Sequence, residues 1–137
     1  MVKSQMAKVN SVNFILKGKT PYKDLAPVFP DILKKILEVN GQDSDEDQIF
    51  DIILASNIPD LEQNRKPEGC NRKGRVRLVF PMDRPEFYIK TYIRSMELKP
   101  IGEEIGAMLV AAKIKFEMRT NDDVEFDAKS SESSGSR

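Results

Sequence analysis

The chain has 137 residues, and its 22 lysines and arginines balance its 22 aspartates and glutamates. This length suits one domain with a single core, and the zero net charge excludes a global field that would attract polyanions. The single cysteine excludes an internal disulfide and favours a reducing compartment, and the absence of histidine excludes His-based triads and metal sites. We therefore expect a non-enzymatic protein without a cofactor.

The two ends of the chain differ in composition from its middle. Residues 1–8 lack the apolar segment of a signal peptide, and we expect a flexible arm there. Residues 128–137 are rich in serine and predict a disordered tail. A single globular domain is expected between them, at residues 9–127. The longest apolar runs are far shorter than the roughly 20 residues that cross a bilayer.

An alternating run that ends at Gly18 predicts the first strand. It places Val12, Phe14 and Leu16 on one face, because side chains in a strand alternate with period two. The next segment, T-P-Y at residues 20–22, predicts a turn or an extended connection.

A helical pattern begins at Asp31 and stops at Asn40-Gly41. Its apolar stripe consists of Ile32, Leu33, Ile36 and Leu37. The short apolar segment at residues 49–57 fits either a helix or a strand. We favour a helix, which Asn57 and Pro59 would end.

Residues 74–94 predict two strands around a proline-bearing turn, after a loop at residues 60–73. The core-seeking face of the two strands comprises Val76, Leu78, Phe80, Phe87, Ile89 and Ile93. The opposite face is basic and carries tyrosines.

Residues 103–119 predict a short helical turn followed by a strand. Residues 103–110 indicate a helical turn, which Gly102 and Gly106 argue against. Residues 111–119 alternate and predict a strand, and Val124 with Phe126 predicts a short edge. The expected fold is α+β: an antiparallel sheet of three to five strands, packed on one face by one or two helices.

An acidic run without basic residues precedes the second helix. It contains Asp43, Asp45, Glu46, Asp47 and Asp51. Four of these match an EF-hand calcium loop, but Gln48 replaces the turn glycine and Leu54 the bidentate glutamate, which argues against calcium. The remaining interpretations are a solvated helix-capping linker and a self-association surface.

A basic loop follows the acidic run in the sequence. It contains Arg65, Lys66, Arg72, Lys73, Arg75 and Arg77. It fits phosphates, anionic lipid headgroups or an acidic partner, including the acidic run of a second copy, but it is equally an ordinary solvated loop. Its cations would also lower the pKa of Cys70.

The polar face of the predicted sheet is the third candidate. With Arg75, Arg77 and Arg119, it carries Tyr88, Lys90, Tyr92, Arg94, Lys113 and Lys115. Tyrosines among cations suit the stacking and phosphate contacts of single-stranded nucleic-acid binding. The same alternation is also the ordinary solvent face of a half-exposed sheet.

Five segments follow one another along residues 10–123. They are V-N-F-I-L-K at 12–17, Y-K-D-L at 22–25 before the amphipathic helix, I-F-D-I-I-L-A-S-N at 49–57, G-R-V-R-L-V-F-P-M at 74–82 and K-I-K-F-E-M-R-T-N-D-D at 113–123. This order resembles the matrix proteins of rhabdoviruses. The chain has only Lys3 and Lys8 in its arm and no Pro-Pro-x-Tyr motif, so a divergent member, such as one from a plant virus, fits best.

The resemblance implies a structural role in virus assembly. Such a protein would self-associate, bind the viral nucleocapsid and attach peripherally to the anionic inner face of a membrane. It would be found in the virion and in the host cell, at membranes or in the cytoplasm. The alternative function is a small protein that binds single-stranded nucleic acid through the basic, tyrosine-bearing sheet face.

Overall fold

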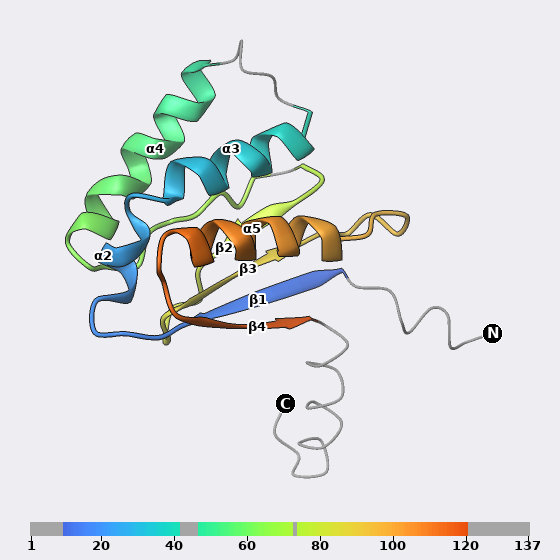
Figure 1. Ribbon diagram of the computed structural model, residues 1–137. Coiled ribbons are helices and arrows are strands. Elements are labelled where there is room, and N and C mark those ends of the chain that lie inside the picture. Colours follow the sequence, from blue (N-terminus) through green and yellow to red (C-terminus); the bar gives the residue numbers. More distant parts are fainter. Residues whose placement is uncertain (1–9, 42–46, 73, 121–137) are drawn as a thin grey trace.

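The computed structural model describes residues 10–41, 47–72 and 74–120 (Figure 1). In chain order its elements are β1 (Ser11–Leu16), α2 (Pro21–Leu25), α3 (Phe29–Val39), α4 (Asp47–Glu62), β2 (Arg77–Val79), β3 (Glu86–Lys90), α5 (Lys99–Ala111) and β4 (Phe116–Thr120). The expected arm at residues 1–8, the tail at residues 128–137 and the short edge at Val124 and Phe126 lie outside the described residues.

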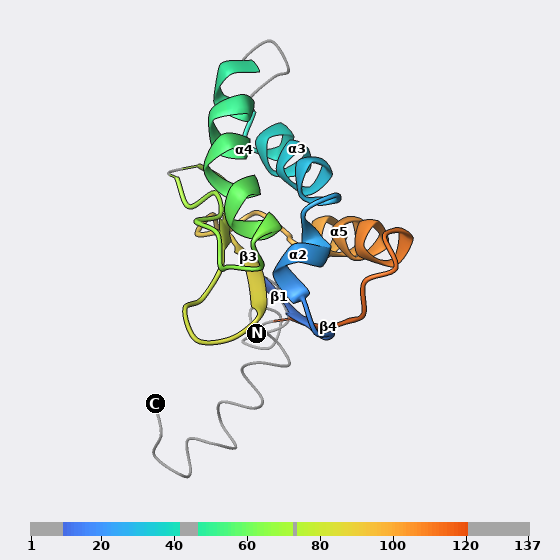
Figure 2. The same ribbon diagram turned by 90° about the vertical axis from the view of Figure 1, so that its left-hand side faces the viewer.

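The strands form one antiparallel sheet in the order β2-β3-β1-β4. The helices lie on one side of it (Figures 1 and 2), so the expected α+β class is confirmed. Helix α5 packs on β1 and β4, α3 contacts both α5 and α4, and α4 packs on α2. One or two helices were expected, and three of those described, α3, α4 and α5, are substantial. The additional one is α5, where only a helical turn was expected.

The core between sheet and helices is centred on phenylalanine rings. Phe14 and Phe87 lie directly opposite each other on β1 and β3, with ring centroids 4.8 Å apart. Phe80 lies 5.4 Å from Phe87, and Phe29 of α3 lies 6.5 Å from Phe80. All four are buried, and such ring pairs add about 0.5–1.5 kcal/mol to burial itself. The inward faces predicted for β1, α3 and β2 are fully buried or nearly so.

Helix α2 begins at Pro21, where a turn or extended connection was expected; that prediction was wrong. Proline suits the first turn of a helix because its missing N–H needs no partner there. The oxygen Oδ1 of Asn64 accepts the N–H groups of Tyr22 and Lys23 at 3.1 and 3.2 Å. This cap comes from a residue 42 positions away from Tyr22, so the local sequence does not reveal it.

Helix α4 confirms the helix favoured for this segment, but it does not end at Asn57 or Pro59. It continues to Glu62 with the proline inside it. Leu61 is fully buried in the last turn, and this burial offsets the hydrogen bond that proline removes. The helix ends where Asn64 adopts a left-handed conformation (φ 55°) and donates its N–H to the Leu61 carbonyl at 2.8 Å.

The glycines that argued against a helix at residues 103–110 lie inside α5 and are buried. A Cβ on Gly102 would lie 3.0 Å from both Cγ atoms of Val12 on β1. The glycine therefore lets the helix approach the sheet closely. A Cβ on Gly106 would have no neighbour nearer than 3.7 Å.

Strand β4 begins at Phe116, so the strand predicted from residue 111 was wrong in its first part. Lys113 has a left-handed backbone (φ 61°), and Ile114 donates its N–H to the Leu109 carbonyl at 3.0 Å. These residues close the C-terminus of α5. The side chain of Lys113 thus does not belong to the sheet face.

The two glycines of α5 make a matched pair of substitutions. We expect Gly106→Ala to stabilise the fold by about 0.5–1 kcal/mol, because alanine is the better helix former and has room there. Gly102→Ala should destabilise the fold by about 1–2 kcal/mol, because the new methyl group pushes against the buried Val12. Urea unfolding followed by circular dichroism measures both. Equal stability of the two variants would contradict the close approach of α5 to β1.

Candidate functional site

The sheet face away from the helices has a basic end and an opposite end where carboxylates are ion-paired with cations. At the basic end, Arg77 of β2 lies directly opposite Lys90 of β3. At the other end, Glu86 and Glu117 lie on either side of Ile15, and each is ion-paired: Glu86 with Arg84 and Glu117 with Lys17, both at 3.7 Å. The uniformly basic face expected from alternation is therefore only partly present.

The basic end contains a cation–aromatic cluster of Arg77, Lys90 and Tyr92. The guanidinium carbon of Arg77 lies 5.3 Å from the centroid of the Tyr92 ring, and Nζ of Lys90 lies 5.4 Å from it. Like charges directly opposite each other on a sheet repel, and the negative face of an aromatic ring offsets part of that repulsion. Tyr92 remains 70% exposed, so its ring can still stack on a ligand.

The position of Tyr92 follows from the end of β3 at Lys90. Thr91 is buried, donates its N–H to the Asn10 carbonyl at 3.1 Å and accepts the N–H of Ile93 on its hydroxyl at 3.1 Å. This turn directs Tyr92 to the surface. It also leaves Ile93 39% exposed, so its predicted place on the inward face was wrong.

Arg77 uses little of its hydrogen-bonding capacity within the described part of the chain. Its Nη1 lies 3.5 Å from Oδ1 of Asn71, a long contact. Its Nε is buried and has no partner among these residues. A buried donor without an acceptor costs about 1–3 kcal/mol, so Arg77 carries hydrogen-bonding capacity that the described residues leave unused.

The other residues expected on this face are not part of the cation–aromatic cluster, although Tyr88 lies two residues from Lys90 on the same face of β3. Tyr88 is half-buried in the middle of β3, and Arg94 is exposed beyond the end of that strand. The carbonyl of Lys115 accepts the N–H of Lys17 at the far end of β1, about 20 Å from the Lys90 end at the strand rise of about 3.4 Å per residue. The structure therefore does not bring Lys113 and Lys115 to Tyr92.

The expected basic loop is not one patch. Arg65 follows α4 and is paired with Asp60 at 2.7 Å, and Lys66 donates to the Pro67 carbonyl. The chain then crosses the molecule toward the start of β2 (Figure 1). Arg72 and Arg75 are exposed at that other end, Arg77 belongs to the cluster, and Lys73 lies outside the described residues.

Most of the acidic run cannot be placed. Asp43, Asp45 and Glu46 lie outside the described residues, and Asp47 marks the start of α4. Asp51 is exposed on that helix. Its role in self-association stays a prediction.

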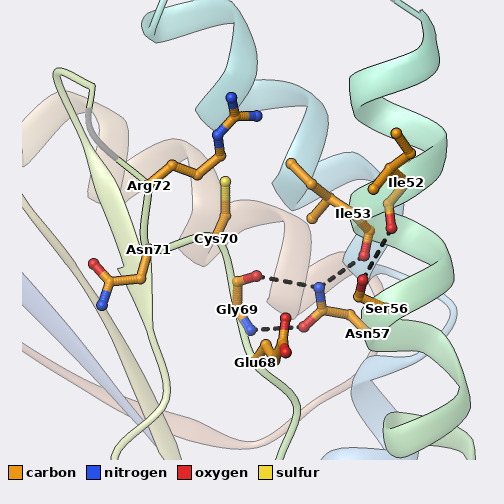
Figure 3. Close-up of a pocket in the computed structure, with 9 residues that line it drawn as sticks. All are labelled: Ile52, Ile53, Ser56, Asn57, Glu68, Gly69, Cys70, Asn71 and Arg72. Carbon is orange, nitrogen blue, oxygen red and sulfur yellow. Dashed lines mark hydrogen bonds between the residues drawn. The ribbon is translucent and has the colours of Figure 1, made fainter.

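A groove between α4 and residues 68–72, here called the α4 groove, was not expected from the sequence (Figure 3). Its volume is about 510 Å³. It is lined by Ile52, Ile53, Ser56 and Asn57 of α4 and by Glu68, Gly69, Cys70, Asn71 and Arg72. Ile52 is 63% exposed on its wall, whereas Ile53 and Cys70 are buried at its base.

Asn57 holds the two sides of the α4 groove together. Its Oδ1 accepts the N–H of Gly69 at 2.7 Å, and its Nδ2 donates to the Gly69 and Ile53 carbonyls at 3.1 and 2.8 Å (Figure 3). Gly69 has φ 82°, and a Cβ there would lie 2.6 Å from the Leu78 carbonyl oxygen. Only glycine fits this position.

Cys70 pairs with Leu78 through two backbone hydrogen bonds of 2.9 and 3.0 Å. Burial raises the pKa of its thiol, and the neighbouring Arg72 only partly offsets this effect. The expected lowering of the pKa by a basic neighbour is present at Arg72, but burial outweighs it and the net shift is upward. A buried, protonated thiol is a structural side chain rather than a nucleophile.

No metal site or membrane span is found in residues 10–41, 47–72 and 74–120. There, no three carboxylate or thiol side chains come together as metal ligands would. No helix in this part of the chain is long and apolar enough to cross a bilayer.

No family model, curated protein or solved structure matches the chain. The resemblance to rhabdovirus matrix proteins therefore stays a prediction. Functional inference rests on the cation–aromatic cluster and on the α4 groove.

Asn57 provides the sharpest test of the groove. We expect Asn57→Ala to lower the free energy of unfolding by about 2–3 kcal/mol, because the N–H and carbonyl of Gly69 lose their partners. Ser56→Ala, a neighbour whose exposed hydroxyl bonds only the Ile52 carbonyl, should cost less than about 0.5 kcal/mol. Guanidinium unfolding compares the two variants. If Asn57→Ala lowered the free energy of unfolding as little as Ser56→Ala, the hydrogen bonds between Asn57 and Gly69 would not hold the groove together.

Proposed function

We propose that this protein binds single-stranded nucleic acid through the cation–aromatic cluster. The observation that supports this function best is the placement of two cations beside one exposed ring, at 5.3 and 5.4 Å from its centroid. A base can stack on Tyr92 while adjacent phosphates contact Arg77 and Lys90. The guanidinium of Arg77, whose Nη1 makes only a long 3.5 Å contact with Asn71, can donate to a phosphate oxygen.

The geometry favours a single strand over a duplex. Stacking on a protein ring requires a base that is free to leave its neighbours, which is the situation in single strands and loops. The cluster offers one ring and two cations, which limits the contact to a few nucleotides. With two cations at the site, binding should weaken with salt at a logarithmic slope of about −1.4.

Fluorescence anisotropy with a labelled oligonucleotide tests this function at low salt. Tyr92→Ala should weaken binding by about 1–3 kcal/mol through the loss of stacking. Lys90→Ala should reduce the magnitude of the salt slope by about 0.7, because one phosphate contact is lost. Lys115→Ala is the matched control, since it removes the same charge at the far end of β1, and it should leave the affinity and slope close to those of the wild type.

Two results would count against this function. Wild-type protein that does not bind at low salt lacks the activity altogether. Equal losses for Lys90→Ala and Lys115→Ala would mean that binding is diffuse and does not use the cluster.

A matrix-type role in self-association is the second candidate. The resemblance implies it, together with contacts to a nucleocapsid and to the inner face of an anionic membrane. The observation that favours it is Ile52, a large apolar side chain that is 63% exposed on the wall of a polar-rimmed groove. Apolar side chains in such a setting are typical of protein contacts.

Light scattering after size-exclusion chromatography tests self-association. The average mass should rise with protein concentration. It should fall when salt is raised from about 50 to 500 mM, because screening weakens contacts between oppositely charged surfaces. A monomer at every concentration and salt would contradict this role and would leave the nucleic-acid proposal untouched.

A further inference from the structure

Residues 69–71 pair with β2 on one side, at Cys70. On the side that faces the α4 groove, only some of their backbone groups are hydrogen-bonded. Cys70 directs its N–H and carbonyl to Leu78 of β2. Backbone groups alternate in direction along a strand, so those of Gly69 and Asn71 point the opposite way. Asn57 occupies the N–H and carbonyl of Gly69 with its side-chain amide. The N–H and carbonyl of Asn71 make no hydrogen bond with any described residue.

The side chains around this edge select an occupant with two properties. Ile52 offers an exposed apolar surface beside the buried Ile53 and Cys70. Arg72 is exposed on the rim and forms no ion pair within the described residues, whereas Glu68 lies at the opposite end of the groove (Figure 3). An extended segment in which apolar and acidic residues alternate would satisfy the strand edge, the apolar wall and Arg72 together.

The chain itself contains such a segment. Residues 123–127 read D-V-E-F-D, so that Val124 and Phe126 alternate with three carboxylates. In an extended conformation both apolar side chains share one face and the acidic ones share the other. We propose that residues 123–127 of one copy dock in the α4 groove of a second copy as a short strand that pairs with Asn71. This inference rests on the second candidate function, self-association, and supplies its contact.

The strand order argues that the docking segment comes from another copy. β4, which precedes residues 123–127, lies at the opposite edge of the sheet from β2, and the Cys70 segment lies one strand further out. Four strand spacings amount to about 19 Å. The four residues from Thr120 to Val124 span at most about 14 Å. The segment of the same copy therefore falls short of the groove.

Three full-length variants test the docking. Ile52→Glu places a carboxylate on the groove wall and should leave the protein monomeric, with its fold intact because the side chain is exposed. Phe126→Asp alters the docking segment and should have the same effect. Val110→Glu is the matched control: Val110 is 65% exposed, close to the 63% of Ile52, but lies on α5. It should assemble like the wild type in analytical ultracentrifugation.

Mixing the two disabled variants is the decisive measurement. Phe126→Asp keeps its groove and Ile52→Glu keeps its segment, so an equimolar mixture should form a one-to-one dimer and nothing larger. A labelled synthetic peptide of residues 121–130 should bind Phe126→Asp protein, and Ile52→Glu should weaken this binding about tenfold or more, as expected for losing a buried isoleucine contact. Circular dichroism establishes that each variant is folded.

Each contrary result has a distinct meaning. A monomeric wild type overturns both this contact and the self-association role. Assembly of Ile52→Glu or Phe126→Asp at the wild-type level overturns the contact but keeps self-association. A mixture that stays monomeric, or a Val110→Glu variant that fails to assemble, overturns the contact as well.

Discussion

The amide of Asn57 bridges the helical layer and the edge of the sheet, and most of the candidate surface depends on that bridge. It satisfies both backbone groups of Gly69, which no strand among the described residues reaches. Gly69 in turn fixes Cys70 on β2, and β2 carries Arg77 into the cation–aromatic cluster. The side-chain amide of Asn57 thus makes the hydrogen bonds that a neighbouring strand would otherwise make with Gly69. These bonds matter because a buried peptide group without a hydrogen-bond partner destabilises the fold.

Charge arrangement matters more than charge total in this chain. The formal charge is zero, yet Arg77 and Lys90 are held directly opposite each other. Such a pair raises the free energy of the folded state unless a ring or an anion compensates, and Tyr92 compensates only in part. A repulsion that is only partly compensated, beside a guanidinium with only one long hydrogen-bonding contact, is an arrangement that a bound anion would stabilise. The combination is therefore a better sign of a ligand than the basic composition of the sheet face.

The sequence allowed the inward faces to be predicted, because burial imposes period two on strands such as Val12, Phe14 and Leu16 and a helical stripe on α3. It failed where the deciding contact is distant in the chain. Gly102 weakens a helix in isolation, but its close approach to Val12 reverses that effect. The cap that Asn64 provides for α2, the clamp of Asn57 on Gly69 and the turn that exposes Tyr92 are likewise tertiary contacts, and no local pattern specifies them.

The cation–aromatic cluster and the α4 groove adjoin at Asn71, which divides its functional groups between them. Its side-chain oxygen faces Arg77, while its backbone groups face the groove side of the strand edge. A β-strand docked at the backbone of Asn71 would therefore leave the contact between Asn71 and Arg77 in place. It would also order residues 69–71, which pair with β2 only at Cys70. Ordering that segment would also fix the guanidinium that a phosphate must meet, so that the entropy cost of nucleic-acid binding would be partly met beforehand. By reciprocity, nucleic acid bound at Arg77 would favour docking in the groove to the same extent. Self-association through the α4 groove and nucleic-acid binding at Arg77 would in this way favour each other through Asn71.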